Sequence, residues 1–266
     1  MIDLKGLFSI WALCGWTTAA LADRDHDPRP EQDFLFLLEE GYVQDRNEWQ
    51  IELAVNRERD GKTDWRTDLG VEYGITERVQ AELSIPYRNL ETTAGSRRSD
   101  VGDIELGLTF AALRETDISP QLALSIETSA PTGDADDGTG AGAWSYGFGV
   151  AASKNVSEHL FLHANAAHER LNNGFGDDQV FDGREWFLGA GGVVEFTRTL
   201  AVTLEYTFEH ERENSNAETE TEQSSLFSIG LIYQPFDEVA VGLAGMLGLN
   251  DQAPDSGIIF RTQVEW

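Results

Sequence analysis

Acidic side chains that alternate with apolar ones form the clearest chemical pattern in this sequence. Between Trp49 and Asn56, Ile51 and Leu53 alternate with polar neighbours such as Glu52, which puts apolar and polar side chains on opposite faces of a β-strand. Followed along the chain, this alternation assigns twelve candidate residues to a polar, inward, lumen-lining face: Glu52, Asp68, Glu72, Glu82, Arg88, Asp103, Glu105, Glu127, His163, Glu195, Glu205 and Arg261. Because most of them are carboxylates, a water-filled space between them would favour cations over anions.

The same inward residues are compatible with two kinds of interior. A narrow barrel can be filled by its own side chains, and carboxylates with a few arginines can form a satisfied internal network. Small residues at inward positions favour an open passage instead: Gly147, Gly149, Gly189, Gly191, Gly230, Gly242 and Ala244. Glycine also accommodates strong barrel curvature, so the sequence does not decide between a conduit and a plugged barrel.

Twelve segments of the chain carry the two-residue alternation that is typical of strands. We predict strands at 48–58, 64–74, 79–89, 101–113, 120–130, 143–153, 158–170, 184–196, 200–211, 224–234, 239–248 and 257–266. Most have the roughly 9 to 11 residues that a tilted strand needs to cross the hydrocarbon layer. An even number also lets the last strand pair antiparallel with the first. The predicted fold class is an all-β, transmembrane, antiparallel up-and-down β-barrel of about 12 strands.

The connections between these segments alternate in length. Short turns are expected at 75–78, 155–158, 198–199 and 235–238. Longer polar loops are expected near 90–100, 131–142, 171–183 and 212–223, with smaller ones near 59–63 and 249–256. Short turns at one end and long loops at the other are typical of outer-membrane barrels, so the sequence places the protein in the bacterial outer membrane.

Aromatic residues gather near the ends of the predicted strands. Trp65, Tyr87, Trp144, Tyr146 and Trp186 fall toward the long loops, and Trp49, Tyr73, Tyr233 and Trp266 toward the short turns. Two membrane girdles follow, although ordinary exposed strand aromatics would give a similar pattern. The last strand ends on Trp266 and resembles the C-terminal aromatic signal that the bacterial barrel-assembly machinery recognises, which makes that machinery an expected partner.

The N-terminal region divides into an export signal and a short extension. Lys5, an apolar run from Gly6 to Trp16, and Ala20-Leu21-Ala22 predict a signal peptide over residues 1–22. The apolar run is too short for a membrane-spanning helix. Residues 23–47 form either a periplasmic segment or a short plug carrying the apolar patch Phe34 to Leu38, and residues 48–266 form the barrel. Cys14, the single cysteine, falls within the predicted signal peptide.

Charge restricts the partners. With 47 acidic and 19 basic residues the net charge is -28, which argues against nucleic acid, because phosphate binding depends on Lys and Arg. Outer-membrane lipids, lipopolysaccharide and a small molecule of undefined identity are the partners that we expect. No cofactor is predicted. The acidic loops, such as Asp134-Ala135-Asp136-Asp137-Gly138, lack the EF-hand spacing, so solvated loops are favoured over a defined metal site, and no metal ligand is assigned.

An enzymatic alternative is a lipid hydrolase carried on the barrel wall. Its nucleophile would need a serine beside a histidine on the outer surface. His168 falls on the outward phase, whereas His163 and Asn165 fall inward, and the sequence offers no serine with a third partner for either histidine. We therefore predict no catalytic residues.

Three segments show a family resemblance: DVGDIELGLTFAAL (100–113), QLALSIETSAPTGD (121–134) and GTGAGAWSYGFGVAASKNVSEHLFLHANAAHE (138–169). They resemble an outer-membrane β-barrel family named for putative transporters of the phenol meta-degradation pathway. The resemblance implies a barrel and the transport of small aromatic or hydrophobic compounds. The function predicted is thus an outer-membrane channel or facilitator for passive uptake of small molecules, and a non-conducting surface or structural barrel is the alternative.

Overall fold

The computed structural model describes residues 34–92, 95–176, 179–214 and 219–266. The predicted signal peptide, its cysteine and residues 23–33 lie outside the described residues. Among the residues that are described, no helix has the length and apolar character needed to cross a membrane.

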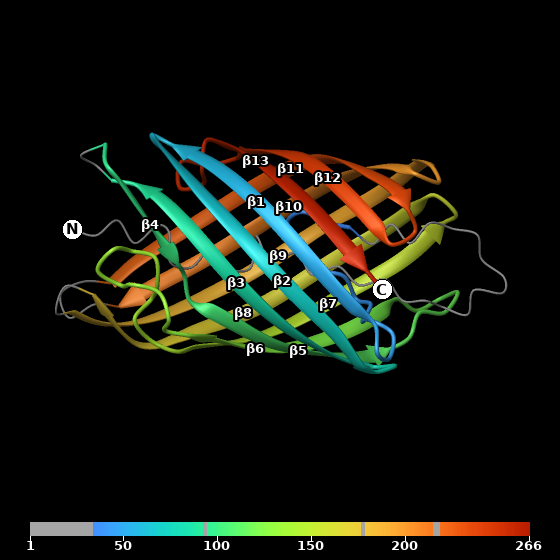
Figure 1. The fold of residues 1–266 in the computed structure, drawn as a ribbon, viewed down its shortest axis with the longest axis horizontal. Helices are drawn as coiled ribbons and strands as arrows, with labels where there is room; N and C mark the ends of the chain where they lie inside the picture. Colours follow the sequence, from blue (N-terminus) through green and yellow to red (C-terminus); the bar gives the residue numbers. More distant parts are fainter. Residues whose placement is uncertain (1–33, 93–94, 177–178, 215–218) are drawn as a thin grey trace.

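Twelve long antiparallel strands form a closed barrel, seen from the side with its tilted strands in Figure 1. The strands in the described part of the chain are β1 (Trp49–Asp60), β2 (Lys62–Thr76), β3 (Val79–Glu91), β4 (Arg97–Val101), β5 (Ile104–Leu113), β6 (Gln121–Ala130), β7 (Ser145–Ser157), β8 (Leu160–Gly176), β9 (Gln179–Thr197), β10 (Leu200–Asn214), β11 (Thr219–Phe236), β12 (Val239–Gly248) and β13 (Ser256–Glu265). Consecutive strands pair with each other, except that β5 pairs with β3 and not with β4, and β13 pairs with β1 to close the ring. The predicted fold class is confirmed.

The additional strand, β4, lies on the rim at the long-loop end and pairs with β3. The loop predicted over 90–100 is wrong at 97–100, whereas Val101 was predicted as the start of the strand at 101–113. All five residues of β4 are exposed and four are polar, so it carries no alternation that could predict a strand. Backbone pairing with the end of β3 forms it instead.

The predicted loops at 171–183 and 212–223 are also largely wrong, because four strands continue beyond the apolar belt. β8 runs to Gly176 and β9 begins at Gln179, while β10 runs to Asn214 and β11 begins at Thr219. Cross-strand backbone hydrogen bonds continue through these polar extensions, where one face no longer needs to be apolar. The loops at 131–144 and 249–255 remain, and the short turns lie together at the opposite end.

Alternation divides the wall as the sequence predicts. On β12, Ala244 and Met246 point inward and are 2% exposed, whereas Leu243 and Leu247 point outward and are 56% and 57% exposed. A belt of exposed aliphatic side chains suits lipid contact. The protein is therefore an outer-membrane barrel with an apolar outer face.

Residues 34–48, which we call the inner segment, lie inside the barrel ahead of β1 (Figure 1). Every side chain from Phe34 to Leu38 is 1% exposed or less. They pack with inward side chains of β8 to β13 in one apolar cluster that includes Phe187, Ile232 and Ile259. Each fully buried side chain of this size contributes roughly 1.5–3 kcal/mol.

Four inward glycines receive the inner segment, so of the two interiors that the sequence left as alternatives these positions fit the filled one. A Cβ atom on Gly189 would lie 2.2 Å from Leu38, and one on Gly230 would lie 2.2 Å from Phe36. On Gly191 and Gly242 the same atom would lie 2.8 Å and 2.4 Å from Leu38 and Phe34, respectively. The missing side chains make room for the apolar patch and not for solvent.

Replacing Gly242 by leucine should push the inner segment off the wall, because its Cβ alone would lie 2.6 Å from Phe36 Cζ. Overpacking costs about 1–3 kcal/mol, so a cysteine placed at Leu37 should react with a maleimide about 5- to 150-fold faster. Gly245→Leu on the same strand is the control, since nothing lies within 4 Å of its Cβ position. Equal labelling rates in both backgrounds, with heat-modifiable gel mobility preserved, would contradict the assigned packing.

Candidate functional site

Glu205 on β10 is the main anchor of the inner segment. Its carboxylate accepts hydrogen bonds from the backbone N–H groups of Phe36, Leu37 and Leu38, with N–O distances of 3.0, 2.7 and 3.0 Å. Successive backbone amides that converge on one carboxylate form an anion-binding nest. Hydrogen bonds to a charged group contribute about 1.5–3 kcal/mol each, so this single side chain dominates the polar grip on the segment.

Arg261 on β13 holds the start of the segment. One guanidinium nitrogen donates to the carbonyl oxygen of Leu35 and another pairs with Glu52 of β1. The guanidinium carbon also lies 5.0 Å from the centre of the Phe34 ring. Arg261 is 1% exposed, so the Glu52 carboxylate is needed to compensate a charge removed from water.

Side chains of β7 and β8 satisfy the next backbone groups. The Glu39 N–H donates to Oδ1 of Asn165 at 2.6 Å, and Nδ2 of Asn165 donates back to the Glu39 carbonyl at 2.8 Å. The Gly41 N–H donates to Ser153 Oγ at 2.8 Å. The side chains of Asn165 and Ser153 thus bind backbone groups of the segment that a neighbouring strand would bind in a sheet.

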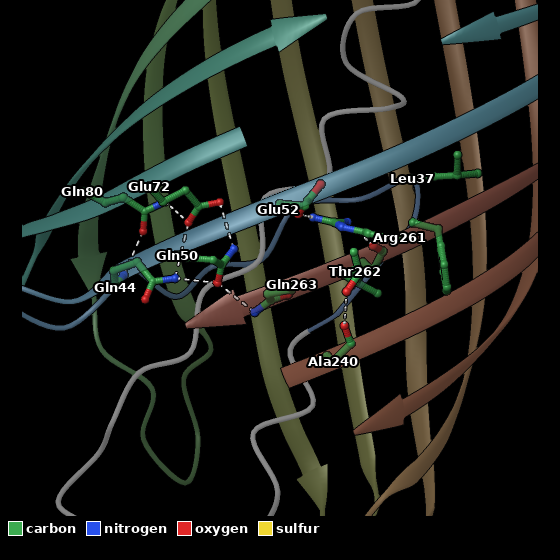
Figure 2. Close-up of polar contacts among 12 residues, drawn as sticks. Leu37, Gln44, Gln50, Glu52, Glu72, Gln80, Ala240, Arg261, Thr262 and Gln263 are labelled. Atoms are coloured by element: carbon green, nitrogen blue, oxygen red, sulfur yellow. Dashed lines mark hydrogen bonds and ion pairs between the residues drawn. The ribbon is translucent and has the colours of Figure 1, made fainter. Parts of the chain in front are cut away.

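Figure 2 shows a glutamine network around Gln44, where the segment approaches β1. The Gln44 N–H donates to Gln80 Oε1 at 2.8 Å, and its side-chain amide donates to Gln50 Oε1 at 2.8 Å. Gln80 and Gln50 both donate to Glu72, at 2.7 and 3.2 Å, and Gln263 donates to Gln50 at 2.7 Å. The network therefore joins Gln44 to side chains of β1, β2 and β3 directly, and to β13 through Gln50.

The chain turns into β1 at Asn47, whose φ of 69° is left-handed. The Asn47 N–H donates to the Gly74 carbonyl at 2.7 Å, and the Gly74 N–H donates to the Glu48 carbonyl at 3.0 Å. A Cβ on Gly74 would lie 1.8 Å from the Asp45 carbonyl oxygen, so only glycine fits there.

The structure places the twelve predicted lumen-lining residues on the inner face of the wall. Ten are buried: Glu52, Asp68, Glu72, Glu82, Arg88, Asp103, His163, Glu195, Glu205 and Arg261. Glu105 and Glu127 are half-buried. Only some of them contact the inner segment. Asp103, for example, accepts the N–H groups of Gly133 and Ala141 at 2.8 and 2.6 Å and so shapes the 131–144 loop.

The interior has an apolar side and a wet side. The apolar side is the cluster of β8 to β13 with Phe34 to Leu38. Opposite it, a cavity is lined by Glu39, Glu40, Tyr42, Gln80, Thr109, Ala123, Ser125 and Ala151. Within the described residues, Glu39 Oε1, Ser125 Oγ, Glu82 Oε2 and Glu127 Oε1 have no hydrogen-bond partner. Buried oxygens without a protein partner commonly bind ordered water, so water is expected in this cavity, and we call this part of the interior the wet side.

A serine–histidine pair inside the barrel was not predicted. Ser153 and His163 are cross-strand partners, and Ser153 Oγ lies 2.9 Å from His163 Nδ1. Among the described residues Nε2 of His163 has no hydrogen-bond partner, and Ser153 Oγ already accepts the Gly41 N–H. The pair faces the interior, and no carboxylate of the described residues bonds to His163, so its geometry supports anchoring of the inner segment.

The predicted girdle aromatics lie on the outer face. Trp49, Trp65, Tyr87, Trp144, Tyr146, Trp186, Tyr233 and Trp266 are all more than 40% exposed. Tyr73 is half-buried because its ring packs against Trp49, with centroids 4.5 Å apart. His168 stacks on Trp186 at 4.3 Å. Stacking on Trp186 gives His168 a structural role on the outer face.

The carboxylates of the acidic loop at 134–138 bind neighbouring protein groups. Asp134 Oδ1 accepts the N–H groups of Asp136 and Asp137 at 2.9 and 3.1 Å, and Asp137 pairs with Arg98 at 3.1 Å. In the part of the chain that the structure describes, no three His, Cys, Asp or Glu residues gather in a metal-binding arrangement.

Solved structures with the same architecture are outer-membrane channels and porins. The COG4313 outer membrane channel from Pseudomonas putida F1 superposes with a TM-score of 0.74 over 85% of this chain and 97% of that chain, at 12% identity. The NanC porin superposes with a TM-score of 0.54 over 80% and 98%, at 13% identity, and the KdgM porin with 0.50 over 81% and 98%, at 9% identity. The fold is thus that of bacterial outer-membrane barrels.

The sequence profile of the family described as "Putative MetA-pathway of phenol degradation" matches residues 38–255, which is 218 of 266 residues. The chain belongs to this family. No curated protein sequence matches it.

Glu205→Ala should free the inner segment, because three backbone N–H groups lose their acceptor. A cysteine at Leu37 should then react at least about tenfold faster with a maleimide. Glu205→Gln keeps one acceptor oxygen and should give an intermediate rate. Glu211→Ala, on the same inner row of β10, is the control and should leave the rate unchanged. A Glu205→Ala rate equal to that of the wild type would show that the carboxylate is not the anchor.

Proposed function

We propose that the protein is a passive outer-membrane channel for small molecules, and that the inner segment acts as its plug. The observation that carries this proposal is how the segment is held. Its backbone is bound by separate wall side chains, Glu205, Asn165 and Ser153 among them, and not by a continuous strand ladder. Such contacts can be released one by one while the closed sheet stays intact.

Two properties of the interior support the kind of cargo. The apolar side offers the rings of Phe34, Phe36 and Phe187, which suits small aromatic or hydrophobic compounds, as the family's description suggests. The wet side offers carboxylates of Glu39, Glu82 and Glu127, each with an oxygen that has no hydrogen-bond partner in the described part of the chain. Small aromatic compounds are the proposed substrates, with cations preferred over anions among the ions that pass.

Single-channel recording in planar bilayers tests the proposal. The wild type should show small discrete conductance steps, and Glu205→Ala should increase their size or open probability. Liposome swelling with small aromatic solutes should follow the same order. If neither protein conducts across several lipids and voltages, the chain is a non-conducting structural barrel and the proposed function is wrong.

Removing charge from the wet side should weaken cation preference. In Glu82→Gln with Glu127→Gln, the cation-to-anion permeability ratio from reversal potentials should fall by at least about fivefold, because each unit charge near the path contributes about 1 kcal/mol in a water-like medium. Glu220→Gln with Glu222→Gln removes the same charge at the start of β11 and should change the ratio less. Anion selectivity in the wild type would contradict the role of these carboxylates.

A further inference from the structure

Three arginines form a row across the outer face of the wall. Arg170 on β8 pairs directly with Arg184 on β9, and Arg184 pairs directly with Arg212 on β10. All three are exposed, and the side chains of Arg170 and Arg184 are 52% and 53% exposed. Directly opposite like charges destabilise a sheet, so this arrangement needs an explanation.

The row lies at the edge of the apolar belt that is nearer to the long loops. Two residues closer to the short turns, the cross-strand row is His168, Trp186 and His210, and the next row is Ala166, Leu188 and Phe208. Two residues span roughly 7 Å along a strand. On the other side of Arg170, its partner on β7 is Tyr146, which is 53% exposed. The arginine row therefore sits where the headgroups of the outer leaflet begin.

One carboxylate only partly balances this charge. Asp182 Oδ1 lies 3.4 Å from Arg170 Nε, and Asp182 Oδ2 lies 3.9 Å from Arg184 Nη2. The remaining groups of the adjoining outer rows are neutral or weakly basic: Tyr146, His168, Trp186, His210 and Thr221. In a chain of net charge -28, three guanidinium groups on one outer surface are a concentrated anion-binding feature.

We propose that the Arg170–Arg184–Arg212 row binds the phosphate groups of the outer-leaflet glycolipid, the lipid A part of lipopolysaccharide. Arginine matches phosphate with paired N–H donors, and phosphates would offset the repulsion along the row. The acyl chains would lie on the aliphatic rows below, and the rings of Trp186 and Tyr146 at the junction between chain and headgroup. Lipid A is the occupant that fits, because charge and apolar surface meet at this height on a lipid-facing wall.

Lipid binding here would act on the wall that anchors the inner segment. The same three strands carry Asn165, Gly189 and Glu205 on their inner face. Bound phosphates would hold β8, β9 and β10 together at their polar end, outside the apolar belt.

The test uses the full barrel in detergent with purified bisphosphorylated lipid A, and measures bound lipid by native mass spectrometry over a titration. The triple variant Arg170→Gln, Arg184→Gln, Arg212→Gln should bind lipid A at least about tenfold more weakly, since each charged hydrogen bond contributes at least that factor. The control is Arg46→Gln, Arg78→Gln, Arg114→Gln, which removes three exposed arginines at the short-turn end. It should bind lipid A like the wild type.

The probes separate phosphate recognition from simple lipid adhesion. Dephosphorylated lipid A should bind the wild type and the row variant equally, and inorganic phosphate alone should not displace lipid A at matched concentration. Equal lipid A affinity in the wild type and the triple variant would overturn the proposal, and so would an equal loss of affinity in the control variant. Equal affinity of the wild type for lipid A and for dephosphorylated lipid A would overturn it as well. If the triple variant does not show heat-modifiable mobility, Arg184→Gln alone takes its place, because Arg184 is the centre of the row.

Discussion

A closed sheet leaves no backbone partner for any chain that enters it, and this constraint governs the interior of the protein. Each strand of the barrel is already paired with its neighbours, so residues 36–44 bind side chains of the wall, and backbone pairing with the wall begins only at Asn47, beside Gly74. Glu205 supplies three bonds through one carboxylate, and Asn165 and Ser153 continue the series. Polar groups of the wall consequently hold the backbone of the segment, and glycines of the wall leave space for its side chains. Its apolar side chains provide most of the contact with the wall.

This division explains why the interior carries two chemistries at once. Apolar residues of β8 to β13 surround Phe34 to Leu38, whereas the carboxylates of Glu82 and Glu127 lie on the wet side. A purely apolar interior would leave the backbone of the inner segment without partners, and a purely polar one would not hold its aromatic rings. The outer face repeats the separation along the membrane normal, with leucines in the belt and arginines above it.

The barrel was predictable because its signal is local. β12 was predicted with the bounds Val239–Gly248 that the structure has, since alternation depends on adjacent residues only. Alternation also placed Glu205 and Arg261 on the inner face. It did not reveal what they bind, because Phe36 is 169 residues from Glu205 and Leu35 is 226 residues from Arg261. For the same reason, the sequence did not decide whether the glycines that receive Leu38 and Phe36 line an open passage or a filled interior. Polar extensions such as β4 were missed because solvent on both faces removes the periodicity.

The long separation between Leu35 and Arg261 has a consequence for biogenesis. The inner segment precedes β1 and so leaves the ribosome before any strand of the barrel, yet its partners are spread from β1 to β13. The full set of its binding partners does not exist until the final strand has been inserted. The first-made part of the described chain is therefore the last that can settle, and its burial reports that assembly of the ring is complete.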